Sequence, residues 1–339
     1  MRIRELDDRY IYLLAEFFVQ AGYFVNIIGS IKKTDYYNSD PYRFYVFMSK
    51  DIKYLDKVPG SPGPQDVLCS DHAVDGQVAS RFDLTISLNY DVDIPPNTTR
   101  RALLLPYPMH PNVYHTGQLD RIPELRQRPK SVGVFFAGNL KGEYACASRL
   151  LRGYLSRPAA IASVLRHFGD RVRLFTTRVA LLRALGEEDL TASIVVFDAT
   201  TERLGREEWF PVLAKSRFFL ALPGVVMPMC HNSVEAMALG VVPILGYGQL
   251  FSPRLESGAV CLGYVSETEL AGAIEEALGM DAPRYERLRQ GSMEHFDRYM
   301  VPGAFLHRLS HDRGQRVEIR FPAEGVSEKL AGAAHRQNY

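Results

Sequence analysis

The residues best suited to bind a charged ligand lie where a short apolar segment passes through a loop into a helix. Residues 218–222 are apolar, Pro223 and Gly224 open the loop, and helical spacing of apolar residues begins at His231. The first backbone N–H groups of a helix have no partner within it, and the helix dipole makes that end positive. We therefore expect Pro223, Gly224 and His231 to line a site for an anion such as a diphosphate.

Three further polar residues occupy the first turns of the same predicted helix. Asn232 and Ser233 are of the types that cap a helix start, and Glu235 follows closely. A carboxylate accepts two hydrogen bonds, which the diol of a ribose can donate. The alternative is that Glu235 has a structural role only and stabilises the helix dipole.

A second glycine-containing turn precedes another predicted helix. Gly138, Asn139 and Lys141 follow an apolar strand, and glycine lets the backbone approach a phosphate while lysine supplies a positive charge. An ordinary strand-to-helix turn explains these residues as well. Arg149 and Arg178 are further candidate cations for a diphosphate, although Arg149 also fits a solvated helix face.

The segments that carry these residues alternate between strand and helix patterns. Such alternation predicts a parallel sheet with helices on both faces. The predicted strands after residue 130 are 132–136, 172–176, 194–197, 218–222 and 241–245, and the predicted helices are 144–154, 179–185, 209–214, 231–239 and 267–278, with later helical patterns at 283–298 and from residue 304. The first part of the chain predicts a helix at 10–21 and strands at 23–28, 42–48, 67–69, 84–88 and 103–105.

The chain length indicates two domains. A chain of 339 residues exceeds what one ordinary core accommodates. The segment 118–130 is polar and basic without apolar periodicity, so we interpret it as a linker. The expected division is an N-terminal domain at 1–125, a ligand-binding domain at 126–305, and a tail at 306–339 that either packs back on the first domain or lacks order.

Composition excludes several classes of protein. A net charge of +1 gives no general attraction to nucleic acid. The four cysteines are scattered without zinc spacing, which indicates reduced thiols and a cytoplasmic protein. No segment has the length of a membrane span. The basic residues 121–130 could still contact anionic lipid at a membrane surface. The alternative is that they form a solvated linker.

The window 216–245 resembles the donor-binding segment of GT-B glycosyltransferases. The matching pieces are Ser-Arg-Phe at 216–218, Pro-Gly at 223–224, Val-Glu-Ala at 234–236 and Gly-Val-Val-Pro-Ile at 240–244, and they are closest to the exostosin-like and fucosyltransferase-like branches. The resemblance implies two Rossmann-like domains facing a cleft, a nucleotide-sugar donor, and a ribose contact at Glu235. Many retaining members carry a second glutamate eight positions earlier, where this chain has Met227, so the sequence favours inversion.

An inverting transfer needs a base that accepts the proton of the acceptor hydroxyl. Candidates follow predicted strands of the first domain: Asp71 with His72 beside it, then Asp91 and Asp93, and His110. We favour Asp71, although an aspartate after a strand also caps turns. Helix starts and arginine or lysine would stabilise the leaving group, so we expect neither a metal nor a cofactor.

The resemblance implies a glycan or lipid-linked acceptor, in surface polysaccharide or lipopolysaccharide synthesis. Two other functions share the predicted donor site: a nucleotide-sugar epimerase, and a binding protein without catalysis. The sequence lacks the GxSxG elbow of serine hydrolases and the GxGxxG motif of dehydrogenases. It does not indicate an oligomeric state.

Overall fold

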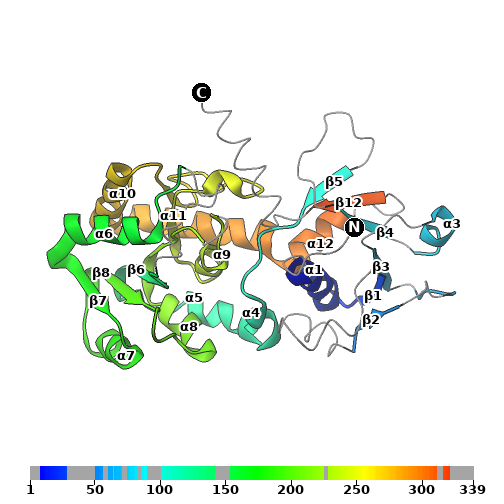
Figure 1. Ribbon diagram of the computed structural model, residues 1–339, viewed down its shortest axis with the longest axis horizontal. Helices are drawn as coiled ribbons and strands as arrows, with labels where there is room; N and C mark the ends of the chain where they lie inside the picture. The colour runs from blue at the N-terminus through cyan, green and yellow to red at the C-terminus, as the bar shows by residue number, and fades with distance from the viewer. Residues whose placement is uncertain are drawn as a thin grey trace. The chain divides into compact units, whose positions relative to one another are not determined.

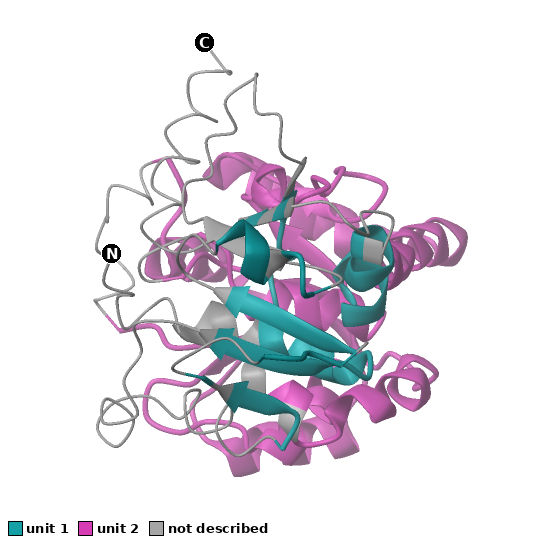
Figure 2. Cartoon of the chain, turned by 90° about the vertical axis from the view of Figure 1, so that its right-hand side faces the viewer, with its two compact units in different colours: residues 1–111, 299–339 teal, residues 112–298 magenta. Residues whose placement is uncertain are grey.

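The chain forms two compact units (Figure 2), residues 1–111 with 299–339 (unit 1) and residues 112–298 (unit 2). The computed structural model describes residues 8–28, 50–55, 60–63, 65–70, 75–82, 85–89, 101–141, 153–224, 228–310 and 316–320. The predicted strand at 42–48 lies outside these residues, as does most of the predicted helix at 144–154. The expected boundary after residue 125 falls inside unit 2.

Unit 1 contains a parallel sheet of six strands in the order β2-β1-β3-β4-β12-β5. Its last strand in the sequence, β12, lies between β4 and β5 and pairs with both. Helices α1 and α12 pack together through the rings of Phe17 and Phe305, whose centroids are 6.0 Å apart. The elements are α1 (Asp8–Gln20), β1 (Phe24–Ile28), β2 (Ile52–Tyr54), β3 (Asp66–Ser70), α3 (Gly76–Ala79), β4 (Thr85–Asn89), β5 (Arg101–Leu104), α12 (Pro302–Ser310) and β12 (Arg316–Arg320).

Unit 2 contains a second parallel sheet of six strands, in the order β11-β10-β9-β6-β8-β7. The strands are β6 (Val132–Gly138), β7 (Val172–Phe175), β8 (Leu190–Asp198), β9 (Ser216–Leu220), β10 (Val242–Leu245) and β11 (Leu262–Gly263). The main helices are α6 (Arg157–Phe168), α7 (Arg178–Glu187), α8 (Arg206–Leu213), α9 (His231–Ala238), α10 (Glu267–Gly279) and α11 (Ala282–His295). Short helices are α4 (Pro111–His115), where the chain enters this unit, and α5 (Ile122–Arg126), with single turns of other helix types at Gln118–Arg121, Gly169–Arg171, Gly248–Leu250 and Phe296–Met300.

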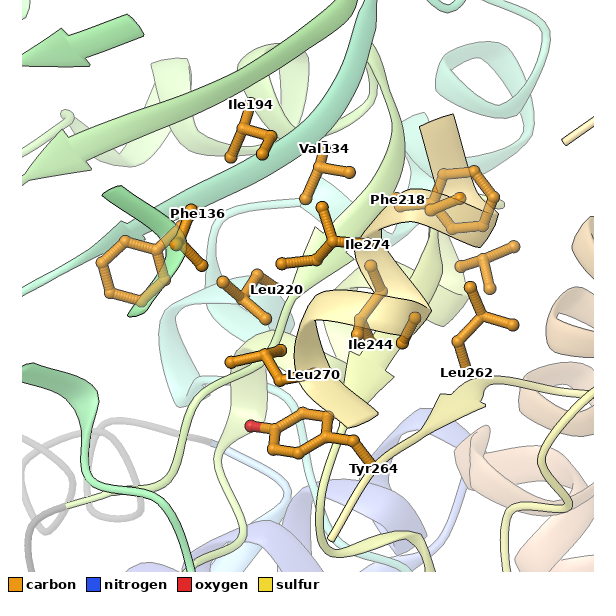
Figure 3. Packing of buried hydrophobic residues seen from close by; sticks show 14 of the residues in the cluster. Val134, Phe136, Ile194, Phe218, Leu220, Ile244, Leu262, Tyr264, Leu270 and Ile274 are labelled. Carbon is orange, nitrogen blue, oxygen red and sulfur yellow. The ribbon is translucent and has the colours of Figure 1, made fainter. Parts of the chain in front are cut away.

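The core of unit 2 is built on both faces of its sheet, as Figure 1 shows for α6 and α10 on one side and α8 on the other. Alternate residues along each strand point to opposite faces. Val134, Phe136, Phe218 and Leu220 belong to the cluster under α6 and α10 (Figure 3). Phe135 and Phe219 face the other way and meet Trp209 of α8. The predicted α/β class with parallel, helix-covered sheets is confirmed.

The prediction that residues 118–130 form a linker is wrong. Part of this segment is helical, and Ile122 and Leu125 are buried in unit 2. Its basic side chains also have partners: Arg121 pairs with Glu207, Arg126 with Asp297 and Arg128 with Glu124, and the Lys130 ammonium donates to the carbonyls of Ala214 and Leu239. These charges are used within the unit, which does not favour a lipid-binding surface here. Among the described residues, no helix has the length and apolar character required to cross a bilayer.

Candidate functional site

The sheet of unit 2 changes direction between β6 and β9. These strands are neighbours, yet the chain proceeds from β6 towards the β8–β7 edge and from β9 towards the β10–β11 edge. The connections that follow these two strands therefore lead to opposite edges of the sheet. Open α/β sheets bind ligands at such a switch point. The site should therefore lie beyond Gly138 and Leu220, where β6 and β9 end.

Arg157 connects the two strand ends at this point. It opens helix α6, which Ser156 caps, and its Nε donates to the carbonyl oxygen of Pro223 at 2.6 Å. Its guanidinium also lies against Gly138, where a Cβ would come within 3.3 Å of Nη1. A guanidinium keeps its positive charge at any physiological pH and suits phosphate oxygens. Arg157 was not among the site residues predicted from the sequence, although Ser156 and Pro158 form a recognisable helix start.

Helix α9 begins at the same edge of the sheet. His231 and Asn232, in its first turn, are half-buried. The expected caps are not used: the capping position is Cys230, and the hydroxyl of the buried Ser233 donates to the Cys230 carbonyl at 2.7 Å. Ser233 is thus turned into the protein and not towards a ligand. The positive end of the helix remains directed at the switch point.

Glu235 lies one turn further along α9 and is fully buried, with 0% of its surface exposed. Its Oε2 accepts a hydrogen bond from the indole Nε1 of Trp209 at 2.6 Å. The Trp209 ring packs against both Phe135 and Phe219, whose own centroids are 6.2 Å apart. A ribose contact at Glu235 stays a prediction, to which the structure adds that one carboxylate oxygen already has a partner.

The turn after β6 is held by the strand next to it. Asn139 Oδ1 accepts hydrogen bonds from the backbone N–H of Lys141 at 2.8 Å and from the Thr200 hydroxyl at 3.1 Å. Thr200 also accepts from the N–H of Leu140. These contacts give Asn139 a role in shaping the loop, and they leave Lys141, which is exposed, at its tip.

Arg178 is paired with carboxylates. Its Nη1 lies 2.8 Å from Glu208, and Glu202 accepts from its backbone N–H at 2.8 Å. Its Nε also lies 3.5 Å from Glu202. These two carboxylates compensate the positive charge of Arg178, which we expected to bind a diphosphate. The structure therefore favours an anchoring role for Arg178.

Of the other predicted site residues, the structure describes some, and the others lie outside the described parts of the chain. The Pro223 carbonyl holds Arg157, and the Gly224 N–H donates to the Pro228 carbonyl at 3.3 Å. His110 is half-buried in the segment after β5. The remaining residues lie outside the described parts of the chain: Asp71, His72, Asp91, Asp93 and Arg149.

A cavity of about 300 Å³ opens at the carboxyl ends of β10 and β11. Since β10 neighbours β9, this cavity lies on the α9 side of the switch point. Its lining includes Gly246, Gly248, Gln249 and Glu269. It therefore offers hydrogen-bonding groups at the end of the strand next to β9.

Comparisons with known proteins identify no family. No protein-family model and no curated protein matches the sequence. Similar solved structures include a glycosyltransferase from Rickettsia africae (9% identity, 90% of this chain and 93% of that one, TM-score 0.46), sucrose-phosphate synthase from Thermosynechococcus elongatus (11%, 89% and 91%, 0.44) and Alr3699/HepE from Anabaena in complex with UDP (10%, 85% and 98%, 0.44). At these identities and TM-scores, the similarity does not identify the residues of the site.

Proposed function

We propose that this chain is a GT-B-type glycosyltransferase whose unit 2 binds a nucleotide-sugar donor at the switch point between β6 and β9. The observation that carries the proposal is Arg157, which bridges Pro223 and Gly138 at the point where α9 begins. A permanent cation and the positive end of a helix converge there, as a diphosphate requires. The resemblance of residues 216–245 to donor-binding segments supplies the chemical class of ligand.

The proposed reaction breaks the bond between the anomeric carbon and the donor's phosphate oxygen. The acceptor hydroxyl oxygen attacks that carbon, its proton passes to a base, and the nucleoside diphosphate leaves with the bonding electrons. Arg157 and the start of α9 stabilise the negative charge that develops on the leaving group, so the proposal requires no metal. Met227 favours inversion, and Asp71, with His72 and Asp91 as alternatives, stays the predicted base.

The finer assignments follow from the resemblance alone. They are the exostosin-like or fucosyltransferase-like branch, and a glycan or lipid-linked acceptor in surface polysaccharide or lipopolysaccharide synthesis. The proposed cytoplasmic location follows instead from the scattered cysteines. We propose that the donor's sugar occupies the cavity at the carboxyl ends of β10 and β11, because Gln249 and Glu269 line it with hydrogen-bonding groups.

A thermal-shift screen against UDP-, GDP-, CMP- and TDP-sugars tests the proposal. One nucleotide class should raise the melting temperature, because a ligand at about 100 times its Kd stabilises the native state by about 2.7 kcal/mol. Arg157→Gln should remove most of that shift, and Arg157→Lys should retain part of it. Glu235→Ala should also abolish the shift if the predicted ribose contact exists.

Arg166→Gln provides the matched control, because Arg166 lies at the other end of α6 and pairs on the surface with Glu267. It should leave the ligand-induced shift unchanged. If no nucleotide class moves the wild-type melting temperature, the donor site does not exist. Product analysis with an acceptor panel then separates the remaining functions: an epimerase converts donor without acceptor, and a binding protein gives affinity without turnover.

A further inference from the structure

The side chain that holds Glu235 is the only tryptophan of the chain. The Trp209 indole N–H donates to Glu235 Oε2 at 2.6 Å, a short distance for a bond between a neutral donor and a carboxylate. We propose that Trp209 is a positioning residue: it fixes the Glu235 carboxylate, and through it the first turn of α9, for donor binding. This inference rests on the proposed function and deepens it.

The indole packs against two aromatic rings that also contact each other, so that its N–H has a defined direction. The ring centroid of Phe135 lies 6.3 Å away, and that of Phe219 lies 6.0 Å away at an interplanar angle of 80°. Both rings come from adjacent central strands, β6 and β9. The same two strands end at the switch point, so the sheet that forms the site also orients the indole.

The helix that carries Trp209 is anchored at its start. Glu208 accepts hydrogen bonds from the N–H of Gly205 at 2.7 Å and from Arg178 at 2.8 Å. Glu207 accepts from Gln118 at 2.9 Å and pairs with Arg121 at 3.2 Å. These contacts fix the first turn of α8, one residue before the indole. Arg178 thereby contributes to the site indirectly, through α8.

The position of Glu235 explains why its orientation affects the helix start. It follows His231 by four residues, which is about 6 Å along a helix axis. Its carboxylate is fully buried, whereas Trp209 is only half-buried. A buried carboxylate requires hydrogen-bond partners. If the carboxylate loses one of these partners, its side chain can adopt another rotamer or the helix that carries it can shift. The indole N–H therefore couples α8 to the α9 N-terminus.

Isothermal titration with UDP, GDP, CMP and TDP measures the consequence. Trp209→Phe keeps an aromatic ring but removes the N–H, and should weaken the bound nucleotide about tenfold or more. Trp209→His retains a ring N–H donor and should recover part of the affinity. In a Glu235→Gln background, Trp209→Phe should reduce the nucleotide affinity clearly less than it does in the wild type, because the effects of substitutions at contacting residues are not additive.

Phe218→Leu is the control for packing. It removes a buried ring of β9 that belongs to the cluster on the opposite face of the sheet and leaves the contacts of the indole in place, so at a matched loss of melting temperature it should retain wild-type affinity. Equal affinity losses for Trp209→Phe and Phe218→Leu, or wild-type affinity in Trp209→Phe, would overturn the positioning role while leaving the donor site intact. Absence of nucleotide binding to the wild type would overturn both proposals.

Discussion

At the scale of single residues, burial determines how unit 2 responds to acid. His295, the last residue of α11, is 7% exposed, and its burial lowers the pKa of its imidazole from 6.5 to about 4. Between these values the unfolded chain binds a proton that the folded protein does not. The free energy of unfolding therefore decreases as the pH falls through this range. Above pH 6.5, protonation of His295 causes no loss of stability.

Replacement of His295 by Gln should flatten this response. The loss of stability between pH 7 and pH 4 should be smaller in the variant than in the wild type by about 2 to 3 kcal/mol. Urea unfolding at several pH values measures the difference. Gln290→Ala, at an exposed and uncharged residue of the same helix, should keep the wild-type slope. An identical slope in His295→Gln would contradict the assignment.

The candidate site shows what sequence reveals about individual residues. That Arg178 follows a strand is evident from the sequence, but its two acidic partners come from residues 202 and 208, and only the fold brings them together. Arg157 was missed because its segment, although it contains the cap and proline of a helix start, gave no helix prediction. The strands that end at this edge of the sheet were predictable from the sequence, but the acidic partners of Arg178 were not.

At the scale of elements, two glycines within helices should respond to alanine with opposite signs. Gly291 of α11 lies so close to the loop before β11 that a Cβ would overlap the Ala259 carbonyl oxygen. Gly272 of α10 has open space at the same position. We expect Gly291→Ala to destabilise unit 2 by about 1 to 3 kcal/mol. Gly272→Ala should stabilise it by about 0.5 to 1 kcal/mol, because alanine has less conformational entropy to lose.

Chemical denaturation of both variants measures these changes, and each serves as the control of the other. The two substitutions add the same methyl group to a helix, so any general effect of alanine is common to both. If Gly291→Ala were as stable as Gly272→Ala, the close approach of α11 to Ala259 would be wrong.

Elements with strong local patterns were predictable, whereas those defined by distant partners were not. The apolar runs of β6, β9 and β10 are nearly continuous because these strands are buried on both faces. Strand β11 has two residues, and β2 has three, so neither gives a periodic signal. The basic residues of 118–130 resembled a linker because their partners, such as Asp297, are remote in sequence.

At the scale of the whole molecule, the chain passes from unit 1 to unit 2 after residue 111 and returns after residue 298. The return supplies α12 and β12, and β12 occupies an interior position in the unit 1 sheet. No local pattern in residues 316–320 shows that they separate β4 from β5. The sheet of unit 1 is therefore built from two segments that flank unit 2 in the sequence.

A chain that ends at Ser310 should lose the fold of unit 1 and keep that of unit 2. Strands β4 and β5 each pair with β12, whose Val317 and Ile319 are fully buried, so its removal leaves β5 without its described neighbour. Limited proteolysis with mass spectrometry should then show cleavage within residues 1–111 and a persistent fragment near 112–298. A chain ending at Arg320 retains β12 and should resist cleavage within residues 1–111. Identical digestion of the two truncated chains would show that β12 is dispensable, and loss of the 112–298 fragment would show that unit 2 depends on unit 1.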